Sequence, residues 1–82
     1  MEKIMIIEIN YHAWLREEIG EKELLHVENE STVEKVIEKL VARHECLKSG
    51  SFLVAVNGKL ASLHTVLKEG DIVSLLPPAG GG

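Results

Sequence analysis

The sequence predicts an α+β domain in which a mixed sheet of four to five strands packs on one main helix. Three observations support this prediction: the chain has 82 residues, one segment has the period of an amphipathic helix, and short runs of Ile, Leu and Val flank it on both sides. A chain of this length buries only about 60 to 65% of the surface that its unfolded form exposes. We therefore expect one small aliphatic core, with no room for a large internal active site.

The main helix has the clearest signal. Ser31 is followed three residues later by Glu34, the pattern of a capping box at a helix start. Apolar residues then recur at spacings of three and four, which places them on one helix face: Val33, Val36, Ile37, Leu40 and Val41. We therefore expect a helix that begins beside Ser31 and packs this face on the core.

The expected strands are short runs of β-branched and other apolar residues. They cover residues 3–11, 24–27, 52–56, 59–61 and 72–76. The second should run antiparallel to the first. Asn57-Gly58 favours a two-residue turn with positive φ, so the third and fourth strands should form a hairpin.

A short helical segment is expected between the first two strands. Leu15 and Ile19 stand four residues apart before Gly20, which predicts one or two helical turns with a glycine stop. Trp14 in this segment is expected to anchor packing. The acidic residues that follow are expected to lie on a solvated face, with orientation of a basic partner as the alternative: Glu17, Glu18, Glu21 and Glu23.

The order strand, strand, helix, strand, short strand, strand fits the ubiquitin-like β-grasp fold, in which the first and last strands are adjacent and central. One helix covers only one face of a sheet, whereas several of these strands are apolar on both faces. An apolar patch should therefore stay exposed and serve as a docking surface.

Partner-binding residues are expected near the end of the last strand and at the start of the third. We single out Leu75, Leu76 and Phe52 for this role. The alternation of the last strand leaves two arrangements open, because either its even-numbered residues (Ile72, Ser74 and Leu76) or its odd-numbered residues (Val73 and Leu75) face outward.

The final residues predict a slender arm. We place the domain at residues 1–76 and a flexible tail at residues 77–82, because Pro77 and Pro78 end a strand and the glycines that follow carry no Cβ: Gly80, Gly81 and Gly82. The reactive group of such an arm is the carboxylate of Gly82, which is ionised at neutral pH. A frayed end or a linker remnant is the alternative interpretation.

Composition narrows the class of partner. The net charge of -4 argues against nucleic acid, whose recognition needs clustered Lys and Arg. The single cysteine, Cys46, fits a reducing compartment, and no run is long enough to span a membrane, so we expect a cytoplasmic protein. The four histidines lack ligand spacing, so no metal site is expected.

Several segments in order resemble the small subunit of molybdopterin synthase, a ubiquitin-like sulfur-carrier family. They are residues 11–20, the helix start Ser31-Thr32-Val33-Glu34, the hairpin Val54-Ala55-Val56-Asn57-Gly58, residues 67–73, and the end Pro77-Pro78-Ala79-Gly80-Gly81-Gly82. Together these segments extend over nearly the whole chain.

The resemblance implies a carrier that binds no cofactor and has no catalytic pocket of its own. An adenylating enzyme of the ubiquitin-activating type would use ATP to activate the carboxylate of Gly82, which would then become a thiocarboxylate. Pro77, Pro78, Gly80 and Gly81 would thread the arm into the large synthase subunit, in a heterotetramer, where sulfur passes to a pterin precursor. Three alternatives remain: a modifier joined to lysines through Gly82, a sulfur carrier for thiamine synthesis, and a plain interaction module.

Overall fold

The computed structural model describes residues 3–48 and 51–77. The elements follow the chain as β1 (Ile4–Tyr11), α1 (Trp14–Ile19), β2 (Lys22–Glu28), α2 (Val33–Arg43), a 3-10 turn (Glu45–Leu47), β3 (Leu53–Val56), β4 (Lys59–Leu60) and β5 (Ile72–Leu76). Every strand predicted from the sequence is present. The second begins two residues earlier and ends one residue later than expected, and the first, third and fourth are each one residue shorter.

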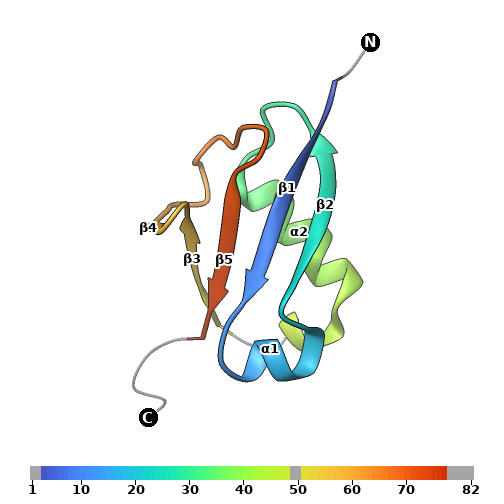
Figure 1. Cartoon of the computed structure of the whole chain (residues 1–82), viewed down its shortest axis with the longest axis vertical. Coiled ribbons are helices and arrows are strands. Elements are labelled where there is room, and N and C mark those ends of the chain that lie inside the picture. Colours follow the sequence, from blue (N-terminus) through green and yellow to red (C-terminus); the bar gives the residue numbers. More distant parts are fainter. Residues whose placement is uncertain (1–2, 49–50, 78–82) are drawn as a thin grey trace.

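The strands form one mixed sheet in the order β2-β1-β5-β3-β4 (Figure 1). β1 pairs antiparallel with β2 and parallel with β5, and β3 pairs antiparallel with both β5 and β4. The first and last strands are therefore adjacent and central, which confirms the predicted ubiquitin-like β-grasp arrangement. α2 crosses one face of the sheet and leaves the other uncovered (Figure 1).

The expected face of α2 is the one that packs on the sheet. Val33, Val36 and Leu40 are buried, and Ile37 and Val41 are half-buried against the same core. The predicted capping box is wrong. Thr32 is the N-cap, and its hydroxyl accepts a hydrogen bond from the Lys35 N–H, whereas the Ser31 hydroxyl donates to the Glu28 carbonyl in the preceding turn. Ser31 thus closes that turn instead of capping the helix.

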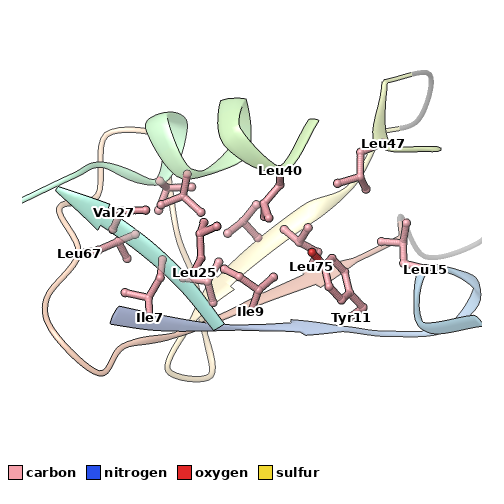
Figure 2. Close-up of a cluster of buried hydrophobic side chains, with 14 of the residues drawn as sticks. Ile7, Ile9, Tyr11, Leu15, Leu25, Val27, Leu40, Leu47, Leu67 and Leu75 are labelled. Carbon is pink, nitrogen blue, oxygen red and sulfur yellow. The ribbon is translucent and has the colours of Figure 1, made fainter. Parts of the chain in front are cut away.

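The core lies between α2 and the sheet, as Figure 2 shows. β1 contributes its odd-numbered residues and β2 contributes Leu25 and Val27. Leu15 closes the end beside α1, but Trp14 is 41% exposed, so the expectation that Trp14 anchors packing is wrong. The 3.6-residue period of the short helix turns Leu15 inward, and its neighbour Trp14 therefore faces away from the core.

The hairpin between β3 and β4 has the predicted turn. Asn57 has φ of 51° and Gly58 has φ of 87°, a region that asparagine and glycine enter at lower cost than other residues. This turn returns the chain to the edge of the sheet and places Asn57 next to the start of β5.

Candidate functional site

The chain leaves the sheet at the end of a central strand. β5 lies between β1 and β3 and ends at Leu76, at the same end of the molecule as α1 (Figure 1). Pro77 is half-buried at this exit. The other residues predicted for the arm, Pro78, Gly80, Gly81 and Gly82, lie outside the described residues, so the prediction of a flexible tail stays a prediction.

The uncovered face of the sheet displays the apolar surface that the sequence predicts. Residues directly opposite each other in a ladder point to the same face. Leu53 is opposite Leu76, and Ile72 shares a row with Glu8 and Leu24. The exposed apolar residues on this face are Ile4, Ile6, Leu24, Leu53, Leu60 and Ile72. We call these six residues the outer patch.

The prediction that Leu75 binds a partner is wrong. Leu75 is fully buried in the core, because β5 turns Val73 and Leu75 toward α2 and leaves Ile72, Ser74 and Leu76 on the outer face. Leu76 is half-buried beside the outer patch and at the chain exit, so its expected role stays a prediction. Phe52 is half-buried and packs against the core, and its role at a partner also stays a prediction.

Sequence reasoning missed several members of the outer patch. Leu60 and Leu24 are among its most exposed residues, at 74% and 61%. Both lie on edge strands, and the sequence alone does not distinguish an exposed apolar residue on such a strand from a buried one. The signal that could have found them is the predicted pairing itself, since it places them in the same rows as Ala55 and Glu8.

A polar network lies on the helix side, where β1, β2 and the end of α2 meet. The Tyr11 hydroxyl donates to Glu23 Oε2 at 2.6 Å, Arg43 donates to Glu23 Oε1 at 2.5 Å, and His44 Nε2 lies 2.6 Å from Glu23 Oε2. The Tyr11 and His44 rings also meet edge to face, with centroids 5.8 Å apart. Glu23 thus ties the carboxyl end of α2 to both strands, and the expectation that it lies on a solvated face is wrong.

The network shifts two pKa values in opposite directions. Partial burial by itself would raise the pKa of Glu23, but the hydrogen bonds from Tyr11, His44 and Arg43 outweigh it and hold the pKa of this carboxyl below its ordinary value. Burial, followed by the hydrogen bond to ionised Glu23, raises the pKa of the Tyr11 phenol. Glu23 is therefore ionised and Tyr11 is neutral throughout the physiological range.

A second polar cluster fixes the start of β5. The Asp71 carboxylate accepts from the Lys68 N–H at 2.8 Å and from Asn57 Nδ2 at 3.0 Å, and Asn57 Oδ1 accepts from the Ile72 N–H at 3.0 Å. The Ile6 N–H donates to Glu69 Oε1 at 3.1 Å, so this turn also satisfies a backbone group of β1. The cluster sets the register of β5, and thereby the point where the chain leaves the sheet.

Neither helix among residues 3–48 and 51–77 has the length and apolar character of a membrane span. Within the same residues, no three His, Cys, Asp or Glu side chains gather in a way that could hold a metal ion.

A mixed five-stranded sheet on one main helix, with a central last strand that runs into the carboxyl-terminal residues, defines a small ubiquitin-like protein of the β-grasp fold. The chain belongs to the ThiS family, whose model matches residues 9–82.

Two proteins with known roles are similar to the chain over nearly its whole length. The molybdopterin synthase sulfur carrier subunit of Haemophilus influenzae is 31% identical over 81 residues, which cover 94% of this chain and 100% of that protein. Small archaeal modifier protein 3 of Haloferax volcanii is 29% identical over 96 residues, covering 95% of this chain and 100% of that protein. The resemblance found in the sequence is thus confirmed.

Solved structures agree with this family. A putative molybdopterin converting factor subunit 1 from Pyrococcus furiosus has a TM-score of 0.85 at 28% identity, covering 92% of this chain and 99% of that chain. A chain in the complex of subunits 1 and 2 of molybdopterin-converting factor from Helicobacter pylori has a TM-score of 0.70 at 28% identity, covering 95% of this chain and 100% of that chain.

Proposed function

We propose that this protein carries sulfur for the biosynthesis of the molybdenum or tungsten cofactor, with the carboxylate of Gly82 as the group that holds the sulfur. The observation that supports it most is the position of β5, a central strand held on both sides that ends at Leu76 immediately before the Pro-Pro-Ala-Gly-Gly-Gly segment. Such a strand fixes the position where the arm begins, because β5 is hydrogen-bonded to β1 on one side and to β3 on the other. The molybdopterin synthase sulfur carrier subunit to which the chain is similar supports the choice of pathway.

The proposed chemistry takes place at the chain end. The Gly82 carboxylate attacks the α-phosphorus of ATP on an adenylating enzyme of the ubiquitin-activating type, and pyrophosphate leaves. A sulfur donor of the hydrosulfide class then attacks the acyl adenylate, displaces AMP and releases a proton, which leaves a thiocarboxylate. The thiocarboxylate is the better nucleophile, and it delivers sulfur to a pterin precursor while water restores the Gly82 carboxylate.

The same arrangement fits two successive partners. The outer patch and Leu76 lie on the face that α2 leaves uncovered, next to the strand that leads to the arm, so a partner can hold the body and receive the arm together. The complex of subunits 1 and 2 from Helicobacter pylori supports a large synthase subunit as one partner, in a heterotetramer. Gly80, Gly81, Pro77 and Pro78 would form the part that threads. The single cysteine suits the reducing cytoplasm, where we place this reaction.

The test of this function is sulfur delivery. The thiocarboxylated protein is prepared with labelled sulfur and mixed with a molybdopterin synthase large subunit and the pterin precursor. We expect label to move to the pterin in a single turnover, and the unsulfurated protein to give none. If label moves only when a thiazole synthase replaces the large subunit, the pathway proposed here is wrong.

A second function has an observation of its own. The similarity to small archaeal modifier protein 3 favours attachment of Gly82 to lysine side chains of other proteins. Tryptic digests of cells that contain this protein would then hold peptides in which a lysine carries residues 69–82, because Lys68 is the last tryptic site before Gly82. Such peptides would have to disappear when Gly82 is deleted.

A further inference from the structure

The sheet has one long edge. β2 has seven residues and, within residues 3–48 and 51–77, pairs with β1 alone, whereas β4 at the opposite edge has two residues. An exposed edge strand presents backbone donors and acceptors that can pair with another strand. β2 contains no proline and no glycine that would interrupt such pairing.

The backbone groups that β2 turns outward follow from its ladder with β1. The Tyr11 N–H donates to the Glu21 carbonyl at 3.0 Å, and the Asn29 N–H donates to the Lys3 carbonyl at 2.7 Å. Hydrogen-bonded pairs alternate along an antiparallel ladder, so Glu23, Leu25 and Val27 also bond to β1. The amide groups that face the open edge therefore belong to the even-numbered residues, Lys22, Leu24, His26 and Glu28.

The edge is complementary to itself. Two copies of β2 that run antiparallel about Leu25 place Lys22 opposite Glu28 and Leu24 opposite His26. Leu24 and His26 then exchange both backbone hydrogen bonds, and the Glu28 N–H donates to the Lys22 carbonyl. The Glu28 carbonyl is already bonded to Ser31 in its own chain and is not needed for these contacts.

Other registers fit less well. Side chains in a ladder must keep to their own face, so the partner strand can shift only in steps of two residues. A shift one way places Lys22 opposite His26 and leaves Glu28 with no strand residue opposite. A shift the other way places Glu28 opposite Leu24 and carries Lys22 past the end of the partner strand. Only the register about Leu25 pairs β2 over its whole length with opposite charges facing each other.

The geometry points to a homodimer of this protein, formed by antiparallel pairing of β2 with β2 of a second copy about a two-fold axis at Leu25. The occupant of the edge is a second copy because the alternating pattern of charge and polarity on β2 is its own complement. Lys22, Leu24, His26 and Glu28 are all exposed and free to meet it. The inference does not rest on the proposed function.

The dimer would leave the chain exit open. β5 is separated from β2 by β1, so both copies would keep Leu76 and Pro77 away from the new contact. The result would be one continuous sheet. The contact is made mostly by backbone groups, and each copy carries a net charge of -4, so the two copies repel each other and we expect a dimer that depends on protein concentration.

Charge exchange at Lys22 and Glu28 tests the dimer. In Lys22→Glu each contact places two carboxylates together, and in Glu28→Lys it places two ammonium groups together. Each variant alone should therefore dimerise at least about tenfold more weakly than the natural protein. An equimolar mixture of the two variants should form a heterodimer, because every contact in it pairs opposite charges. The double variant Lys22→Glu with Glu28→Lys should dimerise like the natural protein.

The measurement is sedimentation velocity over protein concentrations that reach the millimolar range, with one variant labelled in the mixing experiment. Both residues are exposed, so thermal unfolding of the four proteins should coincide and show that each is folded. The proposal is overturned if the natural protein keeps its monomer mass of 9.1 kDa at every concentration, or if the mixture associates no better than the separate variants.

Discussion

At the scale of single residues, Glu23 is the charged group whose side chain joins β2 to β1 and to the end of α2 through polar contacts. Its side chain is 21% exposed, and it accepts from Tyr11 and Arg43 and contacts His44. In the sequence Glu23 is one of several acidic residues, and nothing local separates it from Glu21. Its three partners come from 12, 20 and 21 residues away, a distance that no local pattern reports.

Replacement of Glu23 by glutamine should lower stability in a manner that depends on pH. At pH 7 we expect a loss of about 1 to 2 kcal/mol, because hydrogen bonds to an ionised partner become neutral ones. The folded pKa lies below the ordinary value of 4.5, so ionised Glu23 stabilises the fold above that value, and this contribution is lost as pH falls through the folded pKa. The difference between the two proteins should therefore shrink in acid.

Urea unfolding at several pH values checks this prediction. Glu21→Gln is the matched control, because the Glu21 side chain is 70% exposed and forms an ion pair with Arg16 at 3.4 Å, an exposed pair that contributes little. A loss of stability for Glu23→Gln that stays constant down to pH 3 would contradict the account of this network.

Asn57 has two separable roles. Asn57→Gly removes the side-chain bonds to Asp71 and Ile72 and keeps a residue suited to positive φ. Asn57→Ala removes the same bonds and adds the cost of a Cβ at positive φ, about 1 to 2 kcal/mol. We therefore expect the alanine variant to unfold at lower denaturant concentration than the glycine variant, and equal midpoints would be evidence against this turn.

At the scale of elements, the alternation of β5 separates stability from recognition. Leu75→Ala opens a cavity in the core and should cost about 2 to 5 kcal/mol of unfolding free energy. Leu76→Ala removes a half-buried side chain on the outer face and should cost about 1 kcal/mol or less. Chemical denaturation of both variants measures the difference.

Leu76→Ala, which costs little stability, should have the direct effect on partner binding, because Leu76 lies on the outer face and Leu75 does not. If the outer face is the docking surface, Leu76→Ala weakens binding to the large synthase subunit while its fold is intact. Equal stability losses for Leu75→Ala and Leu76→Ala would mean that the assignment of the two faces is wrong.

The helices and strands were largely predictable from the sequence, but which face of a strand packs on the core was not. The helix period of residues 33–41 and the Asn57-Gly58 turn determine α2 and the β3-β4 hairpin from local chemistry alone. The period of two in β5 is equally satisfied with Leu75 in or out, so only the position of α2 decides it. Thr32 replaced Ser31 as the cap for a similar reason, since both hydroxyls are suited to the role and the preceding turn engages one of them.

At the scale of the whole molecule, the fold joins a rigid body to a chain end. The core and the polar cluster of Asn57 and Asp71 hold β5 in the centre of the sheet, and the outer patch lies on the face that α2 leaves uncovered. Sequence reasoning predicts an arm after Leu76 because the prolines and glycines there differ sharply from the aliphatic strand before them, and this arm stays a prediction. It could not predict the Glu23 network or the self-complementary edge, which exist only once β1 and β2 pair.

Deletion of Gly82 should affect sulfur transfer and leave the stability of the fold almost unchanged. We expect the midpoint of thermal unfolding to change little, since the buried core residues within 3–48 and 51–77 lie at or before Leu75. Transfer of sulfur to the pterin precursor should be lost. Unfolding followed by circular dichroism, beside the labelled-sulfur assay, checks both expectations.

The intact mass of the protein after incubation with its adenylating enzyme, ATP and a sulfur donor tests the central claim most directly. We predict that one oxygen is replaced by one sulfur at Gly82 in the full chain, and that the chain without Gly82 keeps its mass. An unchanged mass for the full chain, or the same exchange in the shortened chain, would contradict the claim that this fold serves to present the Gly82 carboxylate.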